Sequence, residues 1–282
     1  MPFADYSDFP WEKYPNRIVP IMTGRGCEWG RCRFCADVVT AAGRTFRSRS
    51  LVNVLDEIRH QSARHATSLF VFLDLKLNSD LDIWRGMISE LPAVVPDAAW
   101  TASVHVDGRA DHGLSRDDLS AARRAGLARI TTGLETASRR LLKAMAKGTS
   151  PERTREFIRD AASSGISVRL TTIIGYPGEE PADVDATARF LAENAASIER
   201  VMLNRFSLML GTDAEQRSLT RPQSLPGLRR ESVDLANAVV RHTNPAWSGR
   251  EHRRAVYRLM RTVHGINRKP LTARAQEFEG VM

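Results

Sequence analysis

Long apolar runs and a secretory signal are both missing from this sequence of 282 residues. No run of about 18 or more apolar residues occurs, so the sequence predicts no transmembrane helix. The start, Met-Pro-Phe-Ala-Asp-Tyr, lacks the basic-then-apolar order of a secretory signal. We therefore expect a cytoplasmic protein without a membrane partner, and the chain is long enough to bury one large core.

Cysteine is scarce as well. The chain has three cysteines, and all of them lie within nine residues, at Cys27, Cys32 and Cys35. An odd, clustered number argues against a disulfide framework, which spreads even numbers of cysteines over a small secreted chain. Glycines at positions 26 and 30 permit backbone turns that let three thiols face one point. Converging thiols indicate a metal site.

A further absence bears on the choice of metal, because no histidine occurs between Met1 and Arg59. A structural zinc site would need a fourth Cys or His close by. Three thiolates without a fourth ligand therefore favour an iron–sulfur cluster with one open iron over zinc. The remaining alternative is three small buried apolar side chains with no metal at all.

Beyond the cysteines, apolar runs alternate with segments of helical periodicity. Strands are expected at 17–22, 68–74, 100–106, 128–134, 168–174 and 200–206. Helices are expected from residue 51 and over 81–91, 115–125, 138–146, 150–164 and 181–195. Alternating strands and helices predict an α/β fold in which parallel strands form a partial (β/α)6 barrel.

The pattern changes after residue 207. We expect an N-terminal arm over 1–16, the partial barrel over 17–207, and a basic, mostly helical C-terminal extension over 208–282. Within that extension, Gly and Pro predict a loop over 207–229, and periodicity predicts helices over 230–241 and 250–263.

Positive charge is concentrated in the C-terminal part. From Arg221 onward there are twelve Lys or Arg and five Asp or Glu, a balance of +7 in a chain whose net charge is +8. An anionic partner or substrate, such as a nucleic acid, is one interpretation of this excess. A solvated basic surface is the simpler one, because no RNA-binding motif with interleaved aromatic residues accompanies the charge.

Polar residues follow the predicted strands at their carboxyl ends. Active sites of α/β barrels lie at this end of the strands. The cysteines follow the first strand, Asp74 the second, His105 and Asp107 the third, Glu135 the fourth and Gly175 the fifth. This placement predicts a single site at one edge of the sheet.

The cysteine loop resembles the cluster loop of the radical S-adenosylmethionine (SAM) superfamily, in which the last cysteine follows an aromatic residue, here Phe34. That family usually has the spacing C-x3-C-x2-C, whereas this chain has C-x4-C-x2-C. An outward bulge of Trp29 would accommodate the extra residue. Residues 133–138, Gly-Leu-Glu-Thr-Ala-Ser, resemble the family's fourth-strand segment, and residues 173–179, Ile-Ile-Gly-Tyr-Pro-Gly-Glu, resemble its fifth-strand turn. The resemblance covers about residues 15–210.

The resemblance implies a [4Fe–4S] cluster held by Cys27, Cys32 and Cys35, with SAM bound to the open iron. An electron donor such as flavodoxin or ferredoxin would then drive cleavage of SAM to a 5′-deoxyadenosyl radical that abstracts hydrogen from the substrate. The cofactor-binding residues it implies are Phe34, Asp74, Ser103, Glu135, Arg169 and Gly175. His105, Asp107 and Arg205 are candidate catalytic residues, since they are polar and expected at the mouth of the barrel.

Within the superfamily, these segments are most similar to the cobalamin-associated branch, whose members often methylate unactivated carbon or rearrange antibiotic precursors. Such enzymes usually carry a cobalamin domain before the barrel, but only 26 residues precede Cys27. Cobalamin, if used, is therefore expected from another chain, such as a separate accessory protein. We expect a small-molecule or peptide substrate of secondary metabolism. The alternatives are an RNA-modifying radical SAM enzyme that uses the basic C-terminal region, and a non-catalytic cluster-binding or zinc-binding partner protein.

Overall fold

The computed structural model describes residues 2–37 and 46–280. Six strands form one parallel sheet in the order β1-β4-β5-β6-β7-β8, so each strand lies beside its predecessor in this sheet. They are β1 (Ile18–Ile21), β4 (Leu69–Phe72), β5 (Ala99–Val104), β6 (Leu127–Glu135), β7 (Ser167–Ile174) and β8 (Arg200–Arg205). Each predicted strand is present to within two residues, and the α/β partial barrel is confirmed.

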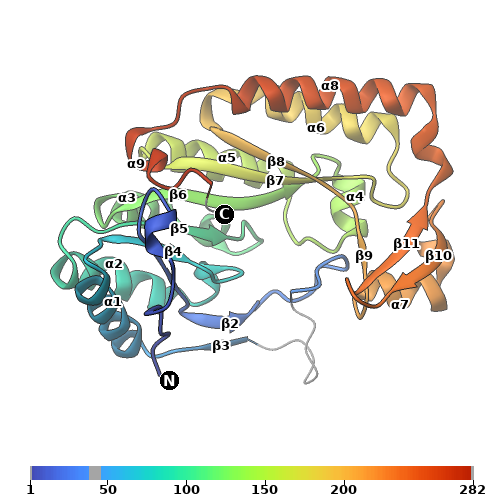
Figure 1. Cartoon of the computed structure of the whole chain (residues 1–282). Coiled ribbons are helices and arrows are strands. Elements are labelled where there is room, and N and C mark those ends of the chain that lie inside the picture. The colour runs from blue at the N-terminus through green and yellow to red at the C-terminus, as the bar shows by residue number, and fades with distance from the viewer. Residues whose placement is uncertain (1, 38–45, 281–282) are drawn as a thin grey trace.

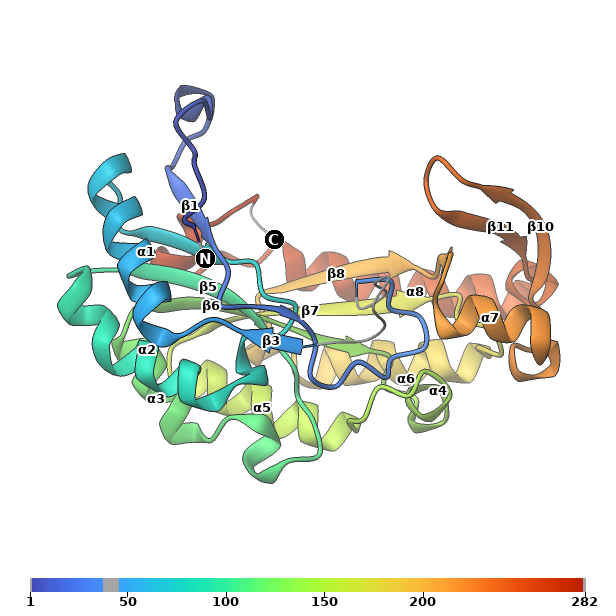
Figure 2. The ribbon, with the colours of Figure 1, turned by 90° about the horizontal axis from the view of Figure 1, so that it is seen from below.

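Helices connect these strands and lie along one side of the sheet (Figures 1 and 2). They are α1 (Leu51–His65), α2 (Leu81–Val94), α3 (Arg116–Arg124), α4 (Arg139–Ala144), α5 (Pro151–Ser163) and α6 (Pro181–Glu193). Five of them begin at a residue whose side chain accepts a hydrogen bond from a backbone N–H of the first turn, namely Ser50, Asp80, Ser115, Ser138 and Ser150. These caps explain why sequence alone located the helix starts.

The core between the sheet and its helices contains two fully buried tryptophans. The rings of Trp84 in α2 and Trp100 in β5 meet edge to face with centroids 5.7 Å apart. The indole nitrogen of Trp100 donates to the carbonyl of Ala125 at 2.8 Å, so its buried N–H is satisfied. The N-terminal arm packs on the same core through Tyr6 and Trp11.

The predicted helix over 230–241 is wrong. These residues form most of an antiparallel hairpin, β10 (Arg229–Asp234) and β11 (Val239–Thr243), which extends the short strand β9 (Leu208–Met209). Val240 is fully buried opposite Leu208. Because β-branched side chains pack well on a sheet, this burial outweighs the helical spacing.

The predicted loop over 207–229 also contains a helix, α7 (Asp213–Thr220), at whose start the side chain of Thr212 accepts a hydrogen bond from the backbone of Glu215. The spacing Thr-x-x-Glu is a capping signal in the sequence. The helix predicted over 250–263 is present as α8 (Arg250–Asn267), which packs on α6 and β8.

The remaining elements are short. They are β2 (Gly24–Gly26), β3 (Phe46–Ser48), α9 (Ala273–Gln276) and the 3-10 helices Trp11–Lys13, Leu77–Ser79, Ala110–Gly113, Ala195–Ser197, Pro222–Ser224 and Pro245–Ser248. Among the helices of residues 2–37 and 46–280, none has the length and apolar character needed to cross a membrane.

Candidate metal centre

The cysteine loop and strands β4, β5, β6 and β7 enclose a cavity of about 340 Å³. Eight of the twelve predicted site residues line this cavity: Cys27, Cys32, Phe34, Cys35, Asp74, Ser103, His105 and Glu135. Because the strands are parallel, their carboxyl ends bring residues far apart in sequence to one place. We refer to this space as the cysteine cavity.

The three cysteines are free thiols of intermediate exposure. In the part of the chain that the structure describes, no three His, Cys, Asp or Glu side chains are close enough to hold a single metal ion. The thiols therefore surround a shared space and do not meet at one point as the sequence suggested. Three thiolates around one cavity are a donor set that fits an iron–sulfur cluster, whose cysteines bind different irons.

The C-terminal end of α4 fixes the cysteine loop. The backbone N–H of Arg33 donates to the carbonyl of Met145 at 2.9 Å, and the guanidinium of Arg33 donates to the carbonyl of Ala144 at 2.7 Å. The indole of Trp29 donates to the carbonyl of Ala146 at 3.0 Å. Carbonyls at a helix C-terminus lack partners within the helix, and here the loop supplies them.

Trp29 does not bulge outward, contrary to expectation. Its ring packs so closely on Gly148 that an added Cβ would lie 2.2 Å from it, and it faces His105 with ring centroids 6.2 Å apart. The outward residue is Glu28, whose side chain is 51% exposed and accepts a hydrogen bond from Lys76 Nζ at 3.1 Å. The longer cysteine spacing is thus accommodated with the indole turned in and the carboxylate turned out.

Glu135 is paired with Lys147, a residue that sequence reasoning missed. Lys147 Nζ donates to Glu135 Oε1 at 2.7 Å, and both side chains are buried. Burial alone would lower the pKa of Lys147, but the carboxylate of Glu135 raises it, so the lysine stays charged. Glu135 also has a left-handed φ of 57°, a strained conformation that is common at functional sites.

The charge of Lys147 acts on the thiols. Burial raises the pKa of Cys32, and Lys147 opposes that shift because a nearby positive charge favours the thiolate. No sequence pattern signals this lysine, since the contact depends on how the chain after α4 folds back over the loop.

Several buried polar atoms in the cysteine cavity have no hydrogen-bond partner within the described ranges. They include Nε2 of His105 and the hydroxyls of Thr101 and Thr132. Burial, with the positive charges of Lys147 and Lys76, lowers the pKa of His105 to about 3, so its imidazole is neutral near pH 7. Unpaired buried polar groups are rare, and their presence here fits a cavity that binds a ligand.

Asp74 lines the cavity, but its carboxylate is already occupied. It accepts hydrogen bonds from the backbone of Thr23 at 3.0 Å and of Gly24 at 2.8 Å. Asp74 therefore fixes the turn between β1 and β2. Phe34 also lines the cavity and packs against the apolar cluster that contains Met145, while Ser103 faces the cavity from β5.

Asp107 lies outside the cavity lining, contrary to its expected catalytic place. Its carboxylate accepts hydrogen bonds from Lys76 Nζ at 3.1 Å and from the backbone of Arg109 at 2.9 Å. Burial would raise the pKa of Asp107, but the hydrogen bonds from Arg109 and the charge of Lys76 lower it, so it stays ionised. Its ion pair holds Lys76, which in turn holds Glu28 of the cysteine loop.

Arg169 is also outside the cavity lining. It lies near the amino end of β7, opposite Arg200 of β8; burial lowers the pKa of Arg169, and the nearby charge of Glu279 opposes that shift. Arg169 is two residues nearer the amino end of β7 than Thr171, which lines the cysteine cavity, so it is farther from the cysteine loop.

Arg205 and Gly175 line a different cavity of about 310 Å³. There the guanidinium of Arg205 stacks on the ring of Trp247, 5.6 Å from its centroid. The same ring covers Gly175, where an added Cβ would lie 3.2 Å from it. Arg205 and Gly175 thus line a cavity with Trp247 and not the cysteine cavity, which sequence alone did not indicate.

Glu179 supports the turn at Gly175 and gives a pH prediction. Its Oε1 accepts from the backbone N–H of Gly175 at 3.0 Å. Burial raises the pKa of Glu179 from 4.5 to about 7. The stability that the neutral carboxyl contributes is fully present below pH 4.5 and is lost as the pH rises through about 7.

We expect the unfolding free energy of the wild type, relative to Glu179→Gln, to fall by about 2 to 3 kcal/mol between about pH 5 and pH 8. Urea denaturation at both pH values measures this difference. Glu231→Gln, at an exposed position in β10, is the control. The difference in unfolding free energy between the wild type and this control should be the same at both pH values. Equal pH dependence of the two variants would contradict the raised pKa.

In this open parallel barrel, three thiols surround a cavity at the mouth, a donor set that suits a thiolate-bound cofactor. The chain belongs to the radical SAM superfamily, whose family model matches residues 21–191. This match confirms the resemblance carried by the cysteine loop and the later strand segments.

Individual relatives cover different shares of the chain. An uncharacterized methyltransferase of Pyrococcus horikoshii is 28% identical over 195 residues, which are 67% of this chain and 40% of that protein. The ribosomal protein uS12 methylthiotransferase RimO of a Roseiflexus species is 29% identical over 266 residues, 88% of this chain and 53% of that protein. This chain therefore spans about half, or less, of the length of these relatives.

Among solved structures, the radical SAM methyltransferase TsrM of Kitasatospora setae matches with a TM-score of 0.66 at 19% identity. The match covers 87% of this chain and 51% of that chain. At this level of identity the likeness shows a shared fold.

Proposed function

We propose that this chain is a radical SAM enzyme that holds a [4Fe–4S] cluster on Cys27, Cys32 and Cys35 and cleaves SAM reductively. Its substrate is a small molecule or a peptide of secondary metabolism, and a reduced flavodoxin or ferredoxin is its electron donor. The observation that carries the proposal is the cysteine cavity, where all three thiols, Glu135 and unpaired buried polar atoms face one space. When bound, the cluster supplies the electron for the cleavage of SAM.

The residues of the chain have distinct roles in this proposal. Lys147 places a fixed positive charge beside the thiolates and orients Glu135 through Oε1. Oε2 of Glu135, which no donor meets in the described part of the chain, is left to accept a hydrogen bond from SAM. His105, neutral and unpaired at Nε2, offers a donor or acceptor to the substrate.

Methyl transfer to carbon is the reaction type that we favour. It is supported by the methyltransferases among the similar proteins. Methylthiolation is the alternative, because a methylthiotransferase is also among the similar proteins. A solved structure of TsrM contains both cobalamin and a [4Fe–4S] cluster.

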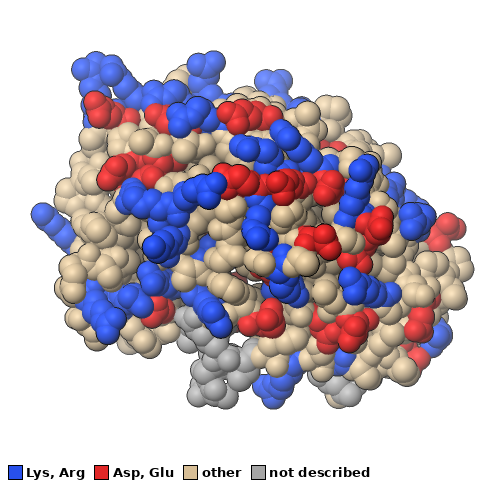
Figure 3. All heavy atoms as spheres, turned by 180° about the vertical axis from the view of Figure 1, so that it is seen from behind, with Lys and Arg blue, Asp and Glu red and all other residues tan. Residues whose placement is uncertain are grey.

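RNA modification through the basic C-terminal part has less support. Several of its arginines are paired with carboxylates, as in Arg258–Asp185 at 2.7 Å and Arg230–Glu215 at 2.9 Å. Figure 3 shows Lys and Arg interspersed with Asp and Glu over the face seen from behind, without one dominant basic patch. This arrangement favours the solvated surface that the composition suggested.

Anaerobic reconstitution of the full chain with iron and sulfide tests the proposal. We expect about four irons per chain, the broad visible absorption of a cluster, and cleavage of SAM when dithionite is added. Release of 5′-deoxyadenosine or S-adenosylhomocysteine, measured by mass spectrometry, reports that cleavage. A colourless protein that retains zinc and leaves SAM intact would refute the proposal.

A further inference from the structure

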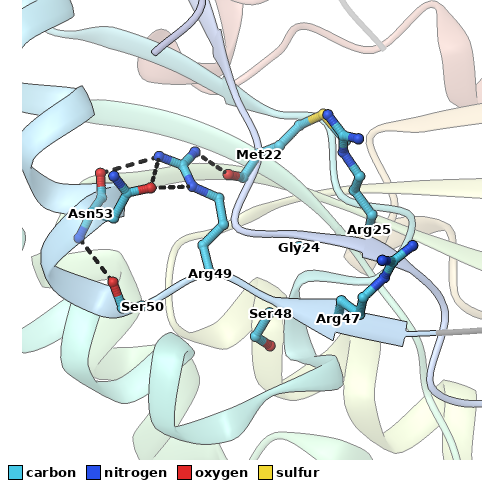
Figure 4. Close-up of a pocket in the computed structure, with 8 residues that line it drawn as sticks. All are labelled: Met22, Gly24, Arg25, Arg47, Ser48, Arg49, Ser50 and Asn53. Carbon is cyan, nitrogen blue, oxygen red and sulfur yellow. Dashed lines mark hydrogen bonds between the residues drawn. The ribbon is translucent and has the colours of Figure 1, made fainter. Parts of the chain in front are cut away.

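A second cavity lies beside the β2–β3 hairpin, at the start of α1, and the metal centre does not use it. Its volume is about 500 Å³, within the range of small-molecule sites. Figure 4 shows its lining, which includes three arginines, Arg25, Arg47 and Arg49, and two serines, Ser48 and Ser50. We call it the arginine cavity.

Arg49 forms the wall of this cavity and is not available to a ligand. Its guanidinium donates to the carbonyl of Met22 at 2.7 Å and to the side chain of Asn53 at 2.7 Å. It also forms a buried ion pair with Glu57. Its charge is therefore balanced within the protein.

Arg25 and Arg47 are different, because nothing balances their charge in the described residues. The strand register places them directly opposite each other in the β2–β3 pair, and both are exposed. Neither makes an ion pair within residues 2–37 and 46–280. The sequence of residues 38–45, between the two strands, contains no Asp or Glu. Like charges facing each other across strands are destabilising, and an anion between them would remove that penalty.

The available donors suit one kind of anion. Each guanidinium presents a planar fork of N–H groups that matches the oxygens of a phosphate. Ser50 accepts a hydrogen bond from the backbone of Asn53, which leaves its hydroxyl hydrogen free to donate. Ser48 is excluded as a donor because its hydroxyl already meets Asp80 at 2.7 Å.

We propose that the arginine cavity binds the phosphate group of a small phosphorylated ligand, held between Arg25 and Arg47. The site adjoins the metal centre through the chain itself. Gly24 lines the arginine cavity and donates its N–H to Asp74, which lines the cysteine cavity. Cys27 follows β2 directly. A ligand here therefore contacts the segment that leads into the cluster loop.

Binding of inorganic phosphate and glycerol 2-phosphate to the reconstituted full chain, measured by calorimetry, tests the proposal. We expect Arg25→Gln and Arg47→Gln each to weaken binding of glycerol 2-phosphate about tenfold or more. The matched control is Arg254→Gln, which removes an equal charge at an exposed position of α8 and should bind like the wild type. Without ligand, the melting temperature of Arg47→Gln should equal or exceed that of the wild type, because the facing charges are gone.

Three outcomes would overturn the proposal. The first is unchanged binding in both cavity variants, and the second is the absence of phosphate binding in the wild type. The third is tight binding of a short oligouridylate that depends on Arg25 and Arg47 while glycerol 2-phosphate does not bind, which would indicate a polynucleotide surface instead.

Discussion

Replacement of Cys35 by alanine should abolish SAM cleavage. Cys35 is one of three thiols around the cysteine cavity, and the chain contains no other cysteine that could replace it. With only two thiolates left, the cluster loses one of its protein ligands. We expect iron content and visible absorption to fall sharply and dithionite-dependent cleavage to drop about 100-fold or more.

The loss of iron and SAM cleavage in Cys35→Ala must be distinguished from misfolding of the variant. Circular dichroism should show the wild-type fold, because the thiol is half-exposed and contributes little to the core. Ser232→Ala, at an exposed position in β10, should retain full iron content and activity. Cleavage of SAM by Cys35→Ala at the wild-type rate would show that the cysteine loop does not hold the reacting cluster.

Gly148→Ala should destabilise the protein and loosen the cysteine loop. Gly148 has a φ of 74°, and an added Cβ would lie 2.2 Å from the ring of Trp29. The ring would have to move, and its hydrogen bond to Ala146 would be lost. Overpacking and backbone strain together predict a loss of about 2 to 4 kcal/mol in unfolding free energy. Urea denaturation and iron retention during reconstitution measure the two effects.

Gly280→Ala is the matched control for this variant. Gly280 also has a left-handed φ, 84°, but an added Cβ would meet nothing within 4 Å. It should lose only the strain of the backbone, about 1 kcal/mol, and keep its iron. Equal losses in the two variants would mean that Trp29 does not pack on Gly148 in solution.

Local signals explain where sequence prediction succeeded in the fold. Buried parallel strands are continuous apolar runs, and the capped helices between them begin at Ser, Asp or Thr. The C-terminal part follows a different rule. There Val240 is buried in a three-stranded sheet, and its partner on the neighbouring strand, Leu208, lies far earlier in the chain. No local pattern contains that partner, so helical spacing misled the prediction.

The candidate site likewise contains residues that the sequence predicted and residues that only the tertiary structure placed there. The cysteines and Glu135 were recognisable because their spacing and their place after strands carry the signal. Lys147 was not, because its contact with Glu135 depends on the fold of the α4 segment. Arg205 and Gly175 were expected with the cysteines, but Trp247, from the residues just before α8, covers them.

The sequence by itself determined the six-stranded parallel barrel and the three-thiol donor set, because hydrophobic periodicity and cysteine spacing are local properties. The tertiary structure alone decided how the loop is held: Trp29 turns inward onto Gly148, and Glu28 turns outward to Lys76. It also decided that Lys147 stands beside the thiols. These contacts join segments that are distant in sequence. Their geometry depends on how those segments pack around one cavity, and no single segment of the chain encodes that packing.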